Sequence, residues 1–339
     1  MDFTPYRDFS GLAPLAAEWN ALLAGSSTHV PFLRHEYLSA WWQTRGGGEW
    51  PRSELALVTA HQQGRLAGIA PLFFAHNREE QPALLLLGSI EISDYLDLIA
   101  CPPDLPAFLS GLLDFLAGPT WPEWRLLDLH NLPEASPSLP LLQAEAEKRG
   151  WTYSQERTYH VPSIPLKGDF ETYLCCIDKK QRHEIRRKMR RAEESGLPVR
   201  WYIVEDGASL DAEVEAFFRM MEQDPDKAAF LTPAMREQMH LACRAAFESG
   251  WLQLAFLEID EQKAAGYLNF DYLNRIWVYN SAIDRRFMDL SSGWVLLGYL
   301  LQWANNNKRD EFDIMRGDEE YKYRFGGVDG FVVRAKLTR

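Results

Sequence analysis

The sequence lacks the motifs that mark several large enzyme classes. Its four cysteines include no pair with the Cys-x-x-Cys spacing of a zinc site. Its eight histidines form neither a His-x-x-x-His nor a His-Glu-x-x-His pattern, so we predict no metal site. It also has no Gly-x-Ser-x-Gly nucleophile elbow, no Walker phosphate loop and no Gly-x-Gly-x-x-Gly dinucleotide fingerprint. Function therefore has to be inferred from less direct patterns.

Long hydrophobic runs and a leader-like start are also missing. The apolar runs, such as residues 83–87 and 294–301, are far too short to span a bilayer. The first residues, MDFTPYRDFSG, show neither the basic n-region nor the apolar h-region of a secretory signal. We interpret the four cysteines as reduced thiols, since the adjacent Cys175 and Cys176 are poorly placed to bond to each other. These features predict a cytoplasmic protein without a transmembrane segment.

An overall surplus of positive charge is absent as well. The formal net charge of −12 argues against a general nucleic-acid binder. The charge is uneven, because residues 1–150 carry 9 basic and 18 acidic side chains, whereas residues 151–339 carry 27 and 30. Much of the positive charge lies in residues 179–191, KKQRHEIRRKMRR, which hold eight Lys or Arg and one acid.

This basic segment has a narrow apolar stripe formed by Ile185, Met189 and Ala192, which predicts an amphipathic helix. Its basic face, with Arg186, Arg187 and Arg190, can bind CoA phosphates, a nucleotide-linked or polyanionic substrate, tRNA or an anionic membrane surface. The alternative is a solvated face without a ligand, the usual fate of such runs.

The remaining patterns predict an α/β protein in which one order of elements occurs twice: helices, a β-hairpin, then strand, helix and strand. In the first half we expect helices at 13–23, 35–44, 105–116 and 139–149, and strands at 54–60, 66–74, 83–88 and 124–129. In the second half we expect helices at 170–174, 179–195, 212–223, 233–249 and 294–305, and strands at 199–204, 252–259, 264–272, 276–283, 312–315 and 331–337. The predicted domains are residues 1–160 and 161–339.

The stretch from residue 276 to 327 has the pattern of an anion site. A strand at 276–283 is followed by Ser291, Ser292 and Gly293, which open an apolar helix. Free backbone N–H groups and the helix dipole favour a phosphate at such a helix start. Arg285 and Arg286, just upstream, can pair with phosphates. The alternative is a serine N-cap beside solvated arginines.

Several segments carry a resemblance to a known family. In the second half these are YNSA at 279–282, LSSG at 290–293, FDIMRGDE at 312–319 and YKYRFG at 321–326. In the first half they are PFL at 31–33, YL at 37–38, AWW at 40–42 and APL at 70–72. Together they resemble the CelD/BcsL-like acetyltransferases of the GNAT superfamily, relatives of the FemAB peptidyltransferases.

The resemblance implies tandem GNAT-like domains, each a mixed sheet flanked by helices, with the donor site in the second domain. It implies acyl transfer from acetyl-CoA or another acyl-CoA to an amine or hydroxyl of a small-molecule or saccharide acceptor, and in several members a link to exopolysaccharide or cellulose production. The backbone at Tyr279 and Ser281 would hold the pantetheine arm of CoA.

Two other functions stay open at this point. Acetyl-CoA users of this fold usually carry a Q/R-x-x-G-x-G/A loop before the helix, whereas residues 289–293 contain one glycine. This difference and the basic segment favour a FemAB-like enzyme that uses aminoacyl-tRNA, although the net charge of −12 does not. A non-catalytic binding protein is the second alternative.

Candidate catalytic groups follow the predicted strand at 312–315. Asp318 or Glu319 can act as a general base on the acceptor, and Tyr321 or Tyr323 can protonate the leaving thiolate. Lys322 is a candidate substrate contact, and its alternative role is an i,i+3 pair with Glu319. In the first half, Asp94 is a candidate for binding the acceptor.

Overall fold

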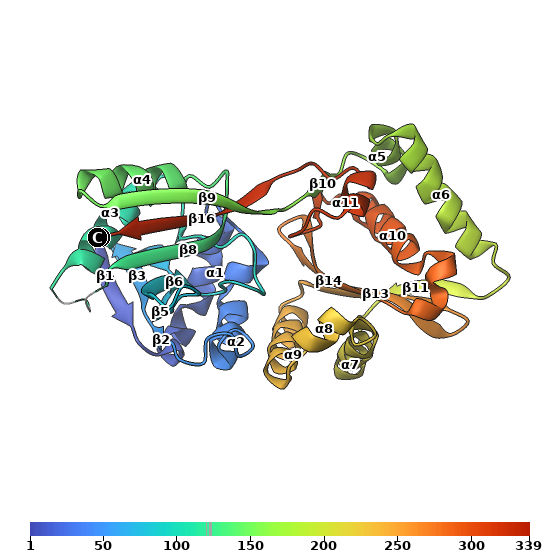
Figure 1. The fold of residues 1–339 in the computed structure, drawn as a ribbon, viewed down its shortest axis with the longest axis horizontal. Coiled ribbons are helices and arrows are strands. Elements are labelled where there is room, and N and C mark those ends of the chain that lie inside the picture. The colour runs from blue at the N-terminus through green and yellow to red at the C-terminus, as the bar shows by residue number, and fades with distance from the viewer. Residues whose placement is uncertain (120, 122–123) are drawn as a thin grey trace. The chain divides into compact units, whose positions relative to one another are not determined.

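The computed structural model describes residues 1–119, 121 and 124–339. The chain forms two compact units, which we call the N-terminal unit (Met1–Tyr159 with Phe331–Arg339) and the C-terminal unit (His160–Gly330) (Figure 1). Each unit combines mixed sheet with helices, as predicted. Within the described residues, no helix has both the length and the apolar character that a membrane crossing requires.

The N-terminal unit contains two sheets. The first has the strand order β1 (Asp2–Tyr6), β3 (Leu57–Gln62), β4 (Arg65–Ala70), β7 (Ile99–Ala100). The second has the order β2 (Glu54–Leu55), β5 (Leu72–His76), β6 (Pro82–Leu86), β8 (Leu126–Pro133), β16 (Phe331–Thr338), β9 (Thr152–His160). The helices are α1 (Ala16–Ala24), α2 (His35–Thr44), α3 (Leu105–Ala117) and α4 (Ser138–Lys148), with short 3₁₀ turns η1 (Phe9–Leu15) and η2 (Pro31–Leu33).

The predicted hairpin of this unit is present as β3 and β4. Gln63 and Gly64 at its tip have φ values of 52° and 79°. Positive φ at both central residues matches the right-handed twist of the strands and suits a two-residue hairpin loop. The strands β1 and β9 were not predicted, because they carry mostly exposed side chains and little apolar alternation.

The last strand of the chain belongs to a different unit from the one we expected. We placed residues 331–337 in the second domain, but β16 pairs antiparallel with β8, for example Val332 with Pro133 and Leu337 with Leu127. Val333, Ala335 and Leu337 are fully buried there. A local pattern predicts a strand but not its partner, because pairing depends on distant residues.

The C-terminal unit is built on one six-stranded sheet. Its order is β10 (Ser163–Pro165), β15 (Glu311–Asp313), β14 (Arg275–Ile283), β13 (Gln262–Tyr272), β12 (Leu252–Ile259), β11 (Val199–Ile203). The pair β14–β15 is parallel and the other pairs are antiparallel. The pair β12–β13 forms the predicted hairpin around residues 260 and 261.

Helices cover both faces of this sheet (Figure 1). One face carries α5 (Phe170–Cys176), α6 (Lys179–Glu193) and α10 (Ser292–Asn306), which share a core with Ile185, Leu297 and Phe312. The other carries α7 (Leu210–Met221), α8 (Pro225–Phe230) and α9 (Pro233–Glu248). A short η3 (Arg285–Leu290) precedes α10, and α11 (Glu320–Arg324) follows β15. Of these helices, α5, α6, α7, α9 and α10 lie close to the predicted positions.

Candidate functional site

The two parallel strands of the C-terminal unit part from each other. They pair only from Arg275↔Glu311 to Trp277↔Asp313, while β14 continues to Ile283. Within β14, the pairing with β13 passes from Val278 to Asn280, so the register shifts by one residue at a bulge that contains Tyr279. Beyond Trp277, β14 is therefore no longer paired with β15.

Polar groups in this part of β14 are bonded to nearby side chains. The Ser281 N–H donates to Asn280 Oδ1 at 2.9 Å. The Ser281 carbonyl accepts from the ammonium of Lys227 on α8, which also donates to Asn280 Oδ1 at 3.1 Å. Tyr279 and Ser281, the predicted donor contacts, thus lie on the parted strand. Their contact with a donor stays a prediction.

The N-terminus of α10 lies at the far end of the parted strand. Ser291 occupies the N-cap position with φ 55° and makes no side-chain cap, so the serine cap that we considered as an alternative is absent. Ser292 is buried, and its hydroxyl donates to the Ala264 carbonyl at 3.0 Å. A Cβ on Gly293 would lie 2.6 Å from Cδ1 of Ile283, so glycine lets the helix start approach the end of β14.

The two arginines before this helix differ in their surroundings. Arg286 pairs with Asp284 at 2.7 Å, and this hydrogen-bonded partner raises the pKa of Arg286. Arg285 is exposed, and its backbone N–H donates to Gln223 Oε1 at 3.2 Å. Both arginines were predicted to contact phosphate. Among the residues that the structure describes, Arg286 has a carboxylate partner and Arg285 has none.

The segment after β15 is fixed by one buried lysine. The Lys322 ammonium is 2% exposed and donates to the carbonyls of Met315, Arg316 and Gly317 at 3.1, 2.5 and 3.3 Å. It also pairs with Glu319 at 3.0 Å, as the i,i+3 alternative predicts. Lys322 therefore holds the turn that presents Asp318 and Glu319, both of which are exposed.

The tyrosines of this segment stay protonated at neutral pH. Burial, and then the charge of Glu319, raises the pKa of Tyr321. Tyr323 is exposed, its hydroxyl donates to Asp329 at 3.2 Å, and its pKa is raised by desolvation and by Asp329. Buried Tyr267 lies close enough for Tyr321 to raise its pKa further. A protonated phenol can donate a hydrogen bond or a proton to a leaving group.

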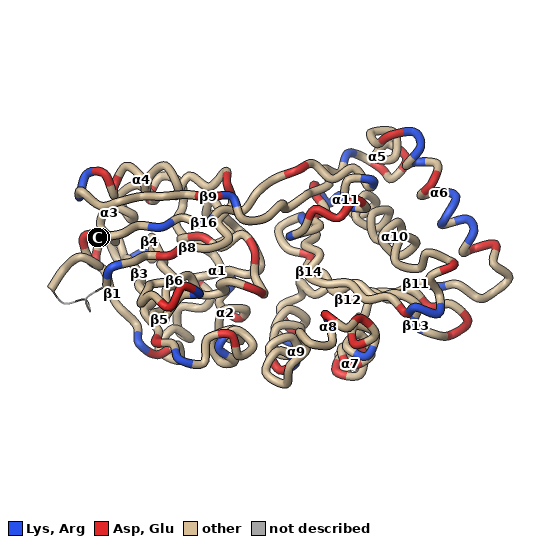
Figure 2. Tube along the Cα trace, viewed as in Figure 1, with Lys and Arg blue, Asp and Glu red and all other residues tan. Residues whose placement is uncertain are grey.

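The basic segment forms the predicted amphipathic helix, α6, capped by Asp178 (Figure 2). Its arginines are not equivalent, because Arg186 pairs with Glu171 and Arg187 with Glu184. Arg190 and Arg191 are exposed and, with Arg187, line a cavity of about 500 Å³ that also touches Leu290 of η3. This places a cationic cavity beside the loop that leads into α10.

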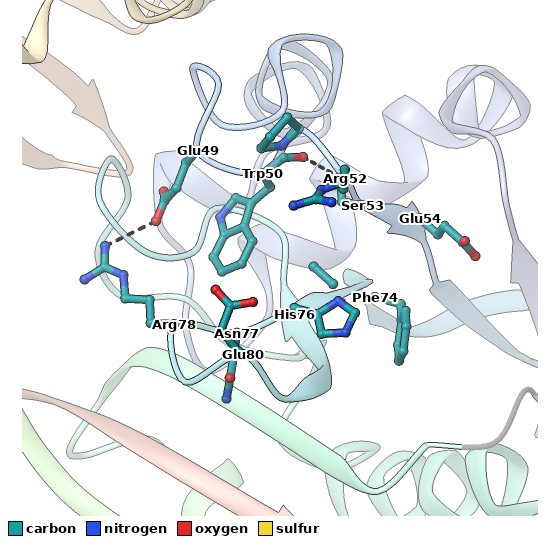
Figure 3. Close-up of a pocket in the computed structure, with 12 residues that line it drawn as sticks. Glu49, Trp50, Arg52, Ser53, Glu54, Phe74, His76, Asn77, Arg78 and Glu80 are labelled. Carbon is teal, nitrogen blue, oxygen red and sulfur yellow. Dashed lines mark hydrogen bonds and ion pairs between the residues drawn. The ribbon is translucent and has the colours of Figure 1, made fainter.

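A larger cavity, of about 840 Å³, lies in the N-terminal unit beside Trp50 and His76 (Figure 3). Several of the polar groups that line it already form hydrogen bonds or ion pairs within the N-terminal unit. Glu49 pairs with Arg78 at 3.3 Å and accepts from the Ile90 N–H, and the Trp50 indole donates to the Ser89 carbonyl. The predicted acceptor contact Asp94 is 5% exposed in the same unit. The chemical groups that match acyl transfer gather instead in the C-terminal unit.

Sequence reasoning missed Lys227 and Asn280 as site residues. The signal for α8 was present, because Asp224 caps this helix and Pro225 occupies its first turn. That signal places a lysine on a short helix, but it does not show that the side chain reaches β14.

Comparisons with known proteins identify a known domain in the second half of the chain. Residues 179–323 match the model of a family described as "Acetyltransferase (GNAT) domain". No curated protein matches the chain.

Solved structures share the fold over almost the whole chain. FemX has 10% identity, a TM-score of 0.64, and coverage of 99% of this chain and 97% of its own. The C-terminal domain of a putative lysylphosphatidylglycerol synthetase from Agrobacterium fabrum has 9% identity, a TM-score of 0.57 and coverage of 96% and 91%. L-PGS from Bacillus licheniformis has 12% identity, a TM-score of 0.55 and coverage of 94% and 90%. Residues 179–323 therefore form an acetyltransferase (GNAT) domain, and the fold of the whole chain is like that of FemX.

Proposed function

We propose that the protein transfers an acyl group from an acyl-CoA to an amine or hydroxyl of a small-molecule or saccharide acceptor, in polysaccharide or cell-envelope synthesis. The observation that carries this proposal is the parting of β14 from β15, with the start of α10 at the end of the parted strand. The strand edge suits an extended pantetheine arm, and the N–H groups at the helix start suit its pyrophosphate.

In the proposed reaction, the donor lies along residues 278–283. The amides of Gly293 and Trp294, with Arg285, contact its phosphates, whereas the Val295 N–H already donates to the Ser291 carbonyl at 3.1 Å. The acceptor nitrogen or oxygen attacks the thioester carbonyl carbon, and the carbon–sulfur bond then breaks. Asp318 or Glu319 takes the acceptor proton, and Tyr321 or Tyr323 protonates the thiolate. Holding the two substrates together supplies much of the rate, since positioning replaces an unfavourable encounter.

A FemAB-like reaction with aminoacyl-tRNA is the second candidate. The cationic cavity of Arg187, Arg190 and Arg191 beside η3 favours it, because a nucleic-acid backbone offers many phosphates to such a surface. The likeness to FemX in fold is compatible with either donor. The non-catalytic alternative from the sequence is not supported by the acetyltransferase match.

A binding titration separates the two donors. Isothermal titration of the full chain with acetyl-CoA, a long-chain acyl-CoA and aminoacyl-tRNA is expected to show saturable binding of a CoA ester. Transfer to candidate amino sugars is then measured with the donor that binds. Saturable binding of tRNA without any binding of CoA esters would reject the CoA proposal in favour of the second candidate.

Reversing the charge of Arg190 and Arg191 is expected to weaken donor binding. The double change Arg190→Glu and Arg191→Glu places two negative charges beside phosphates, so we expect at least a tenfold rise in Kd. Added salt is expected to weaken binding to the unmodified protein, because exposed charges are screened. Arg244→Glu, an exposed change on α9, is the control. Unchanged affinity in both tests would mean that the basic face of α6 is only solvated.

A further inference from the structure

Lys227 contacts β14 in the part of that strand that is not paired with β15. It lies on α8, between α7 and α9 on the same face of the sheet (Figure 1). Its side chain is half-buried, and two of its three ammonium protons are bonded to Ser281 O and Asn280 Oδ1 of β14. The third proton has no partner among the residues that the structure describes.

The charge of this ammonium is not neutralised by a contacting carboxylate. Among the described residues, Asp224 and Glu319 act on Lys227 only as charges at longer range. Lys322, by contrast, contacts three carbonyls and the carboxylate of Glu319. A cation that is withdrawn from water without a paired anion is costly to the fold and is more frequent at functional sites than elsewhere.

Lys227 contacts the strand on which the proposed donor would lie. Glu319, a proposed general base, is near enough to influence its charge. A hydrogen-bond donor at such a place can bind the oxygen on which negative charge develops during acyl transfer.

We propose that Lys227 donates its third ammonium proton as a hydrogen bond to the carbonyl oxygen of the acyl group in transfer. This inference rests on the proposed function. As the acceptor atom bonds to the carbonyl carbon, the π electron pair of the C=O bond moves to the oxygen, and the ammonium stabilises the resulting oxyanion. The pair returns when the bond to the leaving group breaks. Lys227 keeps its proton throughout.

The charged form of Lys227 is therefore the active one. Burial lowers the pKa of Lys227 from its ordinary value, against the opposing effect of Asp224 and Glu319. The rate is expected to fall as pH rises through this lowered pKa. In Lys227→Arg the fall caused by this group is expected to disappear, because a guanidinium does not titrate in the accessible range.

The test uses Lys227→Met and Lys227→Arg in the full chain, with acetyl-CoA and an amine acceptor that the unmodified protein acylates. The methionine variant is expected to lose about 10²–10³-fold in kcat/KM, mainly through kcat, with the Kd for acetyl-CoA within threefold. The arginine variant is expected to recover at least a tenth of the activity and to lose the alkaline fall. Lys263→Met is the control, since Lys263 pairs with Glu213 on the same unit.

The outcomes distinguish this inference from the proposed function. If the unmodified protein is active and Lys227→Met stays within threefold of it, Lys227 does not contact the acyl group, and the proposed function stands. If Lys227→Met lowers the melting temperature and acetyl-CoA affinity while kcat is unchanged, the lysine is only a clamp on β14, and the inference is again wrong. If the unmodified protein neither binds nor uses acetyl-CoA, both ideas fail together.

Discussion

Replacing Glu319 with Gln and Asp318 with Asn in one double variant is expected to lower turnover by about 10²–10⁴-fold, the usual contribution of a general base. Both carboxylates are exposed after β15, on a turn fixed by the buried Lys322 ammonium. The amides keep the size of these side chains but cannot accept the acceptor's proton. Steady-state rates with a saturating donor measure the effect, and the single variants show which carboxylate carries it.

The neighbouring residue provides a matched control for that prediction. Glu320 is exposed and pairs with Arg324 within α11, so Glu320→Gln changes the same charge without touching the proposed base. It is expected to keep full activity. Donor affinity is expected to stay within threefold in all variants, because the bases act on the acceptor. If the double variant works at the normal rate, the base lies elsewhere. If its donor affinity collapses, Glu319 serves mainly to hold Lys322.

Much of the C-terminal unit could be predicted because its elements carry strong local signals. The strands β12 and β13 are runs of mostly apolar residues on either side of a short turn, and α6 has both an apolar stripe and the Asp178 cap. Strand β14 and helix α10 were predictable for the same reason, since each is a mostly apolar segment with a local sequence signal. The segment from Asp318 to Arg324 was also singled out, because a strand end followed by clustered polar residues is visible in sequence, and its catalytic role stays a prediction.

Other parts of the site could not be predicted, since they depend on contacts between distant residues. No local pattern shows that Lys227 reaches the Ser281 carbonyl, 54 residues away. The pair of Arg187 with Glu184 is a local i,i+3 contact, but no local pattern shows that Arg186 pairs with Glu171, 15 residues away, or that Arg190 and Arg191 line a cavity. The bulge at Tyr279 and the early end of β15 arise from strand pairing, which sequence periodicity does not record.

The same limit applies to β16, whose pairing with β8 in the N-terminal sheet includes a buried ion pair. Asp128 on β8 is fully buried and accepts two hydrogen bonds from Arg334 of β16, at 2.7 and 2.6 Å. Arg334 also pairs with Glu79 at 2.7 Å. Burial alone would raise the pKa of Asp128, but Arg334 and His130 hold it well below its usual range.

Removing one partner of this pair is therefore expected to destabilise the N-terminal unit strongly. Arg334→Met leaves the Asp128 carboxylate buried without its main partner, and we expect a loss of about 3–5 kcal/mol in the free energy of unfolding. Replacing both partners, as Asp128→Leu with Arg334→Met, is expected to cost less, because no unpaired charge remains. The exposed pair Arg244–Asp211 is the control, and Arg244→Met is expected to cost under about 1 kcal/mol.

Denaturant unfolding, with hydrogen exchange of the β8 and β16 amides as the local readout, measures these changes. The effect also has a predicted dependence on pH. Because the folded pKa of Asp128 is depressed, its stabilising contribution is present above the ordinary aspartate pKa of about 3.9 and is lost as pH falls towards the folded value. The difference between the unmodified protein and Arg334→Met should therefore be full at neutral pH and shrink in acid. A difference below about 1 kcal/mol at neutral pH would show that the apolar residues of β16, rather than the ion pair, hold this strand in the N-terminal sheet.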